Sequence, residues 1–94
     1  MTPFRFPGEP AWDEARDAIA FPIQLGEYEA TVFIPRREFR SLLGRLPTPE
    51  EAVGLVASDP TRFERAAEHR VLARLLDEDA NITLTGRELR ATEG

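Results

Sequence analysis

Residues 18–35, AIAFPIQLGEYEATVFIP, decide the fold of this chain. On each side of Gly26 the apolar side chains recur at every second position: Ile19, Phe21, Ile23 and Leu25 come first, and Tyr28, Ala30, Val32 and Ile34 follow. Only a strand places residues of that spacing on one face. Two such runs joined by a short glycine turn predict an antiparallel hairpin. Pro22 lacks the N–H that a ladder requires, so the first strand is expected to bulge or to lie at an edge there.

Two further strands are expected, one near each end of the chain. The alternation at 4–6 favours a short edge strand, and 8–16 is expected to be a loop or single turn that contains Trp12. The run at 82–84 favours a last short strand. A capping-box pattern at 85–88 then predicts a brief terminal helix or turn.

Helices are predicted between the hairpin and the last strand. Pro35 suits the first position of a helix, and Gly44 is available to stop it. Thr48 and Glu51 form a capping box that opens a second helix.

A third helix is expected from Pro60 to about Leu76, with Asp59 as its N-cap. Apolar residues follow two of its sides: Phe63, Ala67, Val71 and Leu75 on one, and Ala66, His69, Leu72, Ala73 and Leu76 on the other. A helix that is apolar on two sides is wedged between neighbours. His69 is therefore expected to be a partly buried packing residue, since no motif supplies the nucleophile that a general base would serve.

Together these elements predict a single α+β domain over residues 1–94. The order along the chain is β-β-β-α-α-α-β. Strands joined by short turns pair antiparallel, so we expect an antiparallel sheet of three to four strands with the helices packed on one face.

Composition excludes several classes of function. The chain has no cysteine and one histidine, which removes thiol chemistry and cysteine or multi-histidine metal sites. A net charge of −5 weighs against nucleic acid. The chain holds neither a membrane-length apolar run nor a signal-peptide pattern, so a cytoplasmic protein is expected. With no catalytic motif or cofactor loop, we expect neither an enzyme nor a bound cofactor.

Several short motifs resemble a bacterial family known as domain of unknown function 1488. They are Phe6-Pro7, Trp12-Asp13, Arg16, Ala18-Ile19, Phe21, Phe33-Ile34, Arg62-Phe63, Ala66-Ala67 and 82–85. The chain departs from the family pattern at 77–79, where Asp-Glu-Asp replaces a basic or glycine-rich stretch. The resemblance implies a small α+β domain and carries no established activity, so no site residue is transferred from it.

Two charged segments suggest ligand binding as an alternative function. The acidic segment 77–88 resembles a calcium loop, with Asp77, Asp79 and Asn81 at positions 1, 3 and 5 and Glu88 at position 12. Its sixth position needs a residue that tolerates positive φ, and Ile82 does not. A solvated acidic turn is the competing interpretation.

The second segment is basic: Arg36, Arg37, Arg40 and Arg45 lie around the first expected helix, where they favour an anion or an acidic partner. A solvated helix face is the competing interpretation here.

The leading candidate site is the outer face of the sheet. If the helices cover Ile19, Phe21, Val32 and Ile34, the opposite parity presents Thr31 and Phe33, with Trp12 expected nearby. Exposed aromatic side chains on an open sheet are typical of partner surfaces. We therefore expect an interaction or regulatory module that binds a protein partner or a second copy through Trp12, Thr31 and Phe33. The alternative is that Trp12 and the N-terminal strand fold over this face.

Overall fold

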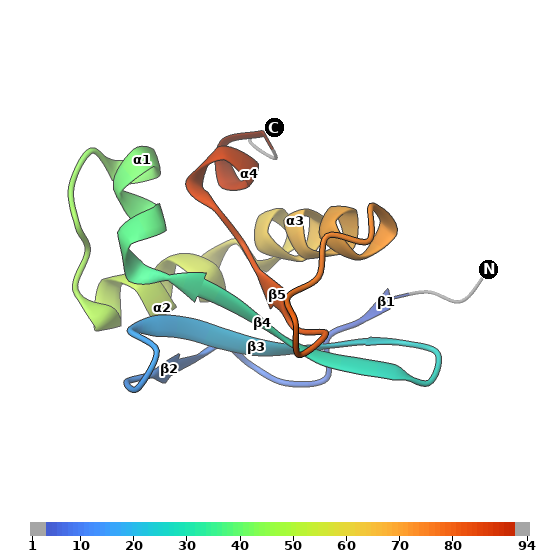
Figure 1. Cartoon of the computed structure of the whole chain (residues 1–94). Coiled ribbons are helices and arrows are strands. Elements are labelled where there is room, and N and C mark those ends of the chain that lie inside the picture. Colours follow the sequence, from blue (N-terminus) through green and yellow to red (C-terminus); the bar gives the residue numbers. More distant parts are fainter. Residues whose placement is uncertain (1–3, 92–94) are drawn as a thin grey trace.

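The computed structural model describes residues 4–91, and for 90 and 91 the backbone only. A five-stranded sheet forms one layer and the helices lie together on one side of it (Figure 1). The strands are β1 (Phe4–Arg5), β2 (Ala11–Asp13), β3 (Ala18–Leu25), β4 (Tyr28–Pro35) and β5 (Ile82–Thr83). The helices are the 3-10 turn η1 (Arg36–Phe39) and α1 (Arg40–Leu43), α2 (Pro49–Ser58), α3 (Pro60–Leu72) and α4 (Gly86–Ala91). The predicted α+β class, with helices on one face, is confirmed.

The predicted hairpin is the centre of the sheet. β3 and β4 pair antiparallel from Ala18 opposite Pro35 to Leu25 opposite Tyr28. On the other edge of β3, β1 pairs with 24–25 and β2 pairs with 18–20. The interruption between them falls around Pro22, which has no N–H to donate, so β3 has an unpaired edge there, as expected.

Two details of the sheet differ from the sequence prediction. Residues 11–13, expected to be loop, form β2 against β3. The last strand was expected to join an antiparallel sheet, but β5 runs parallel to β4, with Ile82 beside Val32 and Thr83 beside Phe33. The reason is that the chain crosses the sheet through the helices between β4 and β5, and such a crossover returns it in the same direction.

The helix boundaries follow the local signals in most places. Gly44 adopts a positive φ of 73° at the end of α1, which is the conformation for which glycine is favoured. Thr48 and Glu51 form both hydrogen bonds of a capping box at the start of α2. At α4 the Glu88 carboxylate accepts a hydrogen bond from the Thr85 N–H at 3.1 Å. These three predictions are confirmed.

The third helix ends four residues earlier than predicted, at Leu72 rather than Leu76. Arg74 takes a positive φ of 58°. Its N–H donates to the Val71 carbonyl and the Leu75 N–H donates to the Arg70 carbonyl. This pattern is the Schellman motif, which closes a helix by turning the chain through one left-handed residue. An arginine occupies the position that usually holds glycine, so the sequence carries no stop signal there.

The hydrophobic core lies between the sheet and the helices. It contains the predicted inward residues of the hairpin, among them Ile19, Phe21, Val32 and Ile34, together with Phe39, Phe63, Ile82 and Leu89. Phe39 and Phe63 pack with ring centroids 6.0 Å apart and join η1 and α3 within the core.

Candidate functional site

The outer face of the sheet is not the open aromatic surface that the sequence predicts. Phe33 lies on that face, as expected, but it is only 7% exposed. The guanidinium carbon of Arg16 lies 4.0 Å from the centroid of the Phe33 ring and covers it. The expected exposure of Phe33 is therefore wrong. The cause is a side chain from the β2–β3 turn, which packs over the ring as a cation–π pair.

Trp12 and Phe33 lie on opposite faces of the sheet. Trp12 pairs with Ile19, and directly opposed residues of an antiparallel pair point to the same side. Ile19 belongs to the core, and Trp12 packs half-buried against the core cluster. Phe33 pairs instead with Ala20, on the other parity. Of the three predicted surface residues, the fold brings Thr31 and Phe33 together and separates Trp12 from them.

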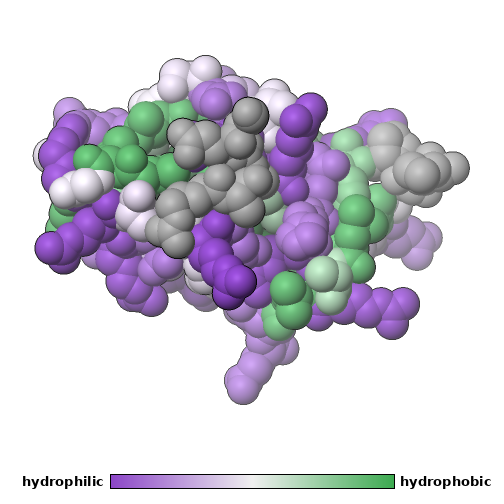
Figure 2. Space-filling view, turned by 90° about the horizontal axis from the view of Figure 1, so that it is seen from above, coloured by the Kyte–Doolittle hydropathy of each residue, from purple (hydrophilic) through white to green (hydrophobic). Residues whose placement is uncertain are grey.

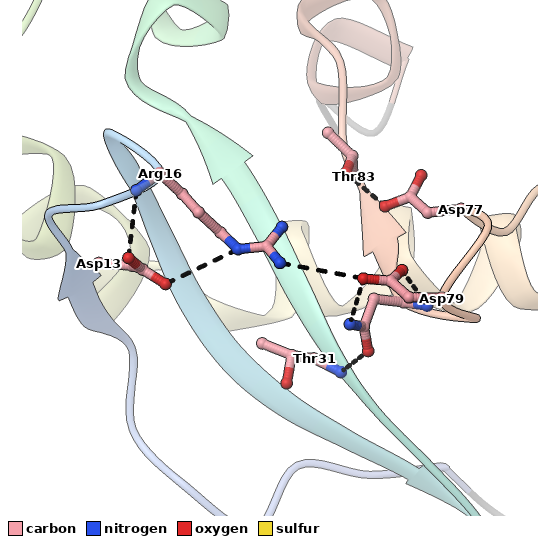
Figure 3. Close-up of polar contacts among 7 residues, drawn as sticks. Asp13, Arg16, Thr31, Asp77, Asp79 and Thr83 are labelled. Carbon is pink, nitrogen blue, oxygen red and sulfur yellow. Dashed lines mark hydrogen bonds and ion pairs between the residues drawn. The ribbon is translucent and has the colours of Figure 1, made fainter.

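An ionic chain fixes the Arg16 side chain over the sheet (Figure 3). Asp13 accepts a hydrogen bond from the Arg16 N–H at 3.2 Å, which stabilises the β2–β3 turn. The guanidinium lies 4.0 Å from the Asp13 carboxylate and 3.9 Å from that of Asp79. Arg16 thus bridges the β2–β3 turn to the loop that precedes β5.

The 77–81 loop is held by its own polar groups (Figure 3). The Asn81 carboxamide accepts the Thr31 N–H at 3.0 Å and donates to Asp79 at 3.1 Å. The Thr83 hydroxyl donates to Asp77 at 2.6 Å. The hydrogen bond from the Asn81 N–H is the main cause that lowers the pKa of Asp79. Asp77 and Asp79 are thus engaged in the closure of the loop, while Glu78 is exposed.

The geometry of the calcium-like segment does not assemble its proposed ligands. Ile82, at the sixth position, lies in β5 and is fully buried. Glu88, at the twelfth, pairs with Arg70 at 2.8 Å. Among residues 4–91 no three acidic or histidine side chains are grouped so that they could hold a metal ion.

The basic segment after the hairpin is largely paired with acids. Arg36 lies 3.4 Å from Asp17, and Arg37 lies 3.3 Å from Glu38. Arg45 donates to both carboxylate oxygens of Glu51. That contact is the largest cause that lowers the pKa of Glu51 from its ordinary value of 4.5 to about 2. The cations are therefore partly neutralised within the fold.

A group of leucines that the sequence places in the core is exposed at the end of α3 and just after it. Leu72, Leu75 and Leu76 are 71%, 49% and 38% exposed, and we call these three residues the leucine ridge. His69, expected to be partly buried, is exposed as well. Seen from the helix side, apolar side chains reach the surface on the side of α1 and α2 and on the side where α3 ends (Figure 2).

Two hollows of opposite charge border the leucine ridge. The basic hollow, about 670 Å³, lies between α3 and α4 and is lined by Leu75 with Ala66, His69, Arg70, Thr85, Arg87 and Glu88. The acidic hollow, about 580 Å³, is lined by Leu76 with Arg16, Asp77, Glu78 and Asp79. The half-buried Arg70–Glu88 pair forms part of the basic hollow, and Arg70 also donates to the Leu75 carbonyl at 3.3 Å.

Sequence reasoning misses this region because it assigns all three leucines to a continuous helix. The one sequence signal that could have found this region is the change of charge around the leucines. Arginines occur up to Arg74, and acidic residues follow from Asp77 onward.

Within the part of the chain that the structure describes, no helix has both the length and the apolar character to cross a membrane.

Neither a family model nor a curated protein sequence matches this chain. A search of solved structures finds a match in the crystal structure of a DUF1488-family protein of unknown function from Shewanella loihica PV-4. The TM-score is 0.77 at 20% sequence identity, and the match covers 89% of this chain and 93% of that one. The resemblance to domain of unknown function 1488 that the short motifs indicate is thus confirmed, at the level of the fold.

Proposed function

We propose that this protein is a small interaction module that binds another polypeptide through the leucine ridge at the end of α3. The observation that carries the proposal is the exposure of three neighbouring leucines in a domain whose other large apolar side chains are mostly covered. Among the described residues, Leu46 is the single large hydrophobic residue of comparable exposure, at 47%, elsewhere on the surface. A local apolar cluster with a charged border is typical of partner surfaces.

The leucine ridge takes the place of Trp12 and Phe33 as the proposed binding surface. The Phe33 ring is covered by Arg16 and the Trp12 indole packs against the core, so both offer little area to a partner. It retains the expectation of a cytoplasmic binding protein without a catalytic step. The hollows beside the leucines offer arginine and carboxylate groups that mainly pair with one another. Such paired groups suit recognition by charge better than acid–base catalysis.

The test is photo-crosslinking in the cells that naturally make the protein. A photoreactive phenylalanine analogue is placed at position 72 in one variant and at position 46 in a control, since both positions carry exposed leucines. We expect discrete crosslinked adducts from position 72 and none of the same mass from position 46. Absence of adducts from position 72, or identical adducts from both positions, contradicts the proposal.

A further inference from the structure

The charge pattern around the leucine ridge is complementary to itself. Leu75 borders the basic hollow and Leu76 borders the acidic one, so the apolar residues separate two edges of opposite sign. In a two-fold symmetric contact the same patch is used by both copies, and when the symmetry axis runs between the two edges, each edge meets the opposite edge of the other copy. An acidic partner would match one edge and be repelled by the other.

We infer that the leucine ridge is the interface of a symmetric dimer, in which the basic edge of each copy faces the acidic edge of the other. This inference rests on the proposed function and names its partner as a second copy of this chain. Leu72 and Leu76 lie at the centre of the contact. Glu78 of one copy faces Arg87 of the other, and the symmetry makes this contact twice.

Glu78 and Arg87 carry the charge pairing because they are exposed members of the two edges. Glu78 is adjacent to Asp79, which pairs with Arg16. Arg87 lies in the first turn of α4 and is adjacent to Glu88, which pairs with Arg70. Their neighbours are thus engaged within the fold, while these two side chains project from it. A chain with a net charge of −5 repels a second copy in general, so local complementarity is what permits association.

Three leucines from each copy and two ion pairs make a small interface, so the dimer is expected to be weak. Contacts below about 1,200 Å² of buried area are typical of transient complexes, and a dissociation constant of about 10–100 µM is expected. Because exposed ion pairs contribute, the dissociation constant should rise with salt.

Analytical ultracentrifugation over about 1 µM to 1 mM tests the dimer. The wild type should pass from monomer to dimer across this range. Glu78→Arg and Arg87→Glu should each weaken association about tenfold or more, since each variant places like charges opposite one another. The double variant Leu72→Ser/Leu76→Ser should remain monomeric, whereas the control Leu46→Ser should dimerise like the wild type.

Mixing the two single-charge variants is the decisive arm of this experiment. In a mixed pair, the arginine introduced at position 78 of one chain would face the glutamate introduced at position 87 of the other. At the symmetry-related contact the unchanged Glu78 and Arg87 would still face each other, so association should return although neither variant associates well alone. Circular dichroism verifies that the variants remain folded.

Three outcomes would overturn the inference: a wild type that stays monomeric throughout, association that survives loss of the leucines, or a mixture that stays monomeric. A monomer that still forms the position-72 adduct with a different protein would leave the proposed function standing.

Discussion

The guanidinium carbon of Arg16 lies 4.0 Å from the centre of the Phe33 ring and closes the outer face of the sheet. The arginine is held there from two sides, by Asp13 in its own turn and by Asp79 in the loop before β5. The strand parity places Phe33 on the outer face of the sheet, and the Arg16 side chain covers it there. This contact removes the sheet from the candidate binding surfaces and leaves the end of α3.

Replacing Arg16 by alanine should destabilise the fold by about 1 kcal/mol, because the Phe33 ring loses both its cover and its cation–π partner. Urea unfolding measures the change. Arg16→Lys is the matched control and should retain part of the stability, because it keeps the charge but not the planar guanidinium. An Arg16→Ala variant as stable as the wild type would show that the arginine does not cover the ring in solution.

Replacing Arg74 by glycine should raise the free energy of unfolding by about 0.5–1 kcal/mol. The residue stands at a positive φ of 58°, where an arginine is strained and a glycine is not. Arg74→Ala removes the charge but keeps a Cβ, so it should not raise the free energy of unfolding. The comparison separates the effect of backbone strain from that of the lost charge. If the alanine variant gains as much stability as the glycine variant, relief of strain at this position is not the cause of the gain.

Gly86 should be intolerant of alanine. A Cβ at this position would lie 2.1 Å from the Ser41 Oγ and 3.0 Å from the Glu38 carbonyl oxygen, where α4 meets α1. Gly86→Ala is expected to cost about 1–3 kcal/mol through overpacking. Gly54 in α2 is the control, since a Cβ there meets nothing within 4 Å. Gly54→Ala should stabilise by up to about 1 kcal/mol, and equal effects at both glycines would refute the packing argument.

The acid sensitivity of the fold should depend on Glu51. Its folded-state pKa of about 2 lies below the ordinary value of 4.5, mainly because Arg45 donates to the carboxylate. A lowered pKa contributes stability above the unfolded value, and that contribution is lost as the pH falls from about 4.5 towards 2. The stability difference between wild type and Glu51→Gln should therefore be constant near neutral pH and shrink in that acid window. Glu50→Gln is the control, and a difference that does not change with pH contradicts the pairing.

Local chemistry is what made much of the fold predictable. The period of two around Gly26 determines the hairpin, and Thr48 with Glu51 determines the start of α2, because in each case neighbouring residues supply the interaction. The parity of the strands also assigns Ile19, Phe21, Val32 and Ile34 to the core correctly. The direction of β5 was not predictable in this way, because it depends on the path of the helices between β4 and β5.

The candidate site was less predictable because its determinants are tertiary or lack a sequence signal. Arg16 reaches Phe33 only after the turn before β3 folds over the sheet. Leu75 and Leu76 lie outside α3 because the chain leaves the helix before them, at Arg74, a residue with no special preference for the left-handed conformation. Phe33→Asp would place a charge in a buried site, so it would report on stability and not on binding.

The central claim is that the leucine ridge is a binding surface, and hydrogen exchange tests it most directly. Exchange of the purified chain at about 1 mM, where the expected complex between two copies forms, is compared with exchange at about 1 µM, where it does not. The account predicts slower exchange at 69–78 in the complex and unchanged exchange at 41–47, around the exposed control Leu46. Unchanged exchange at 69–78, with protection confined to another surface such as the hairpin turn, would contradict it.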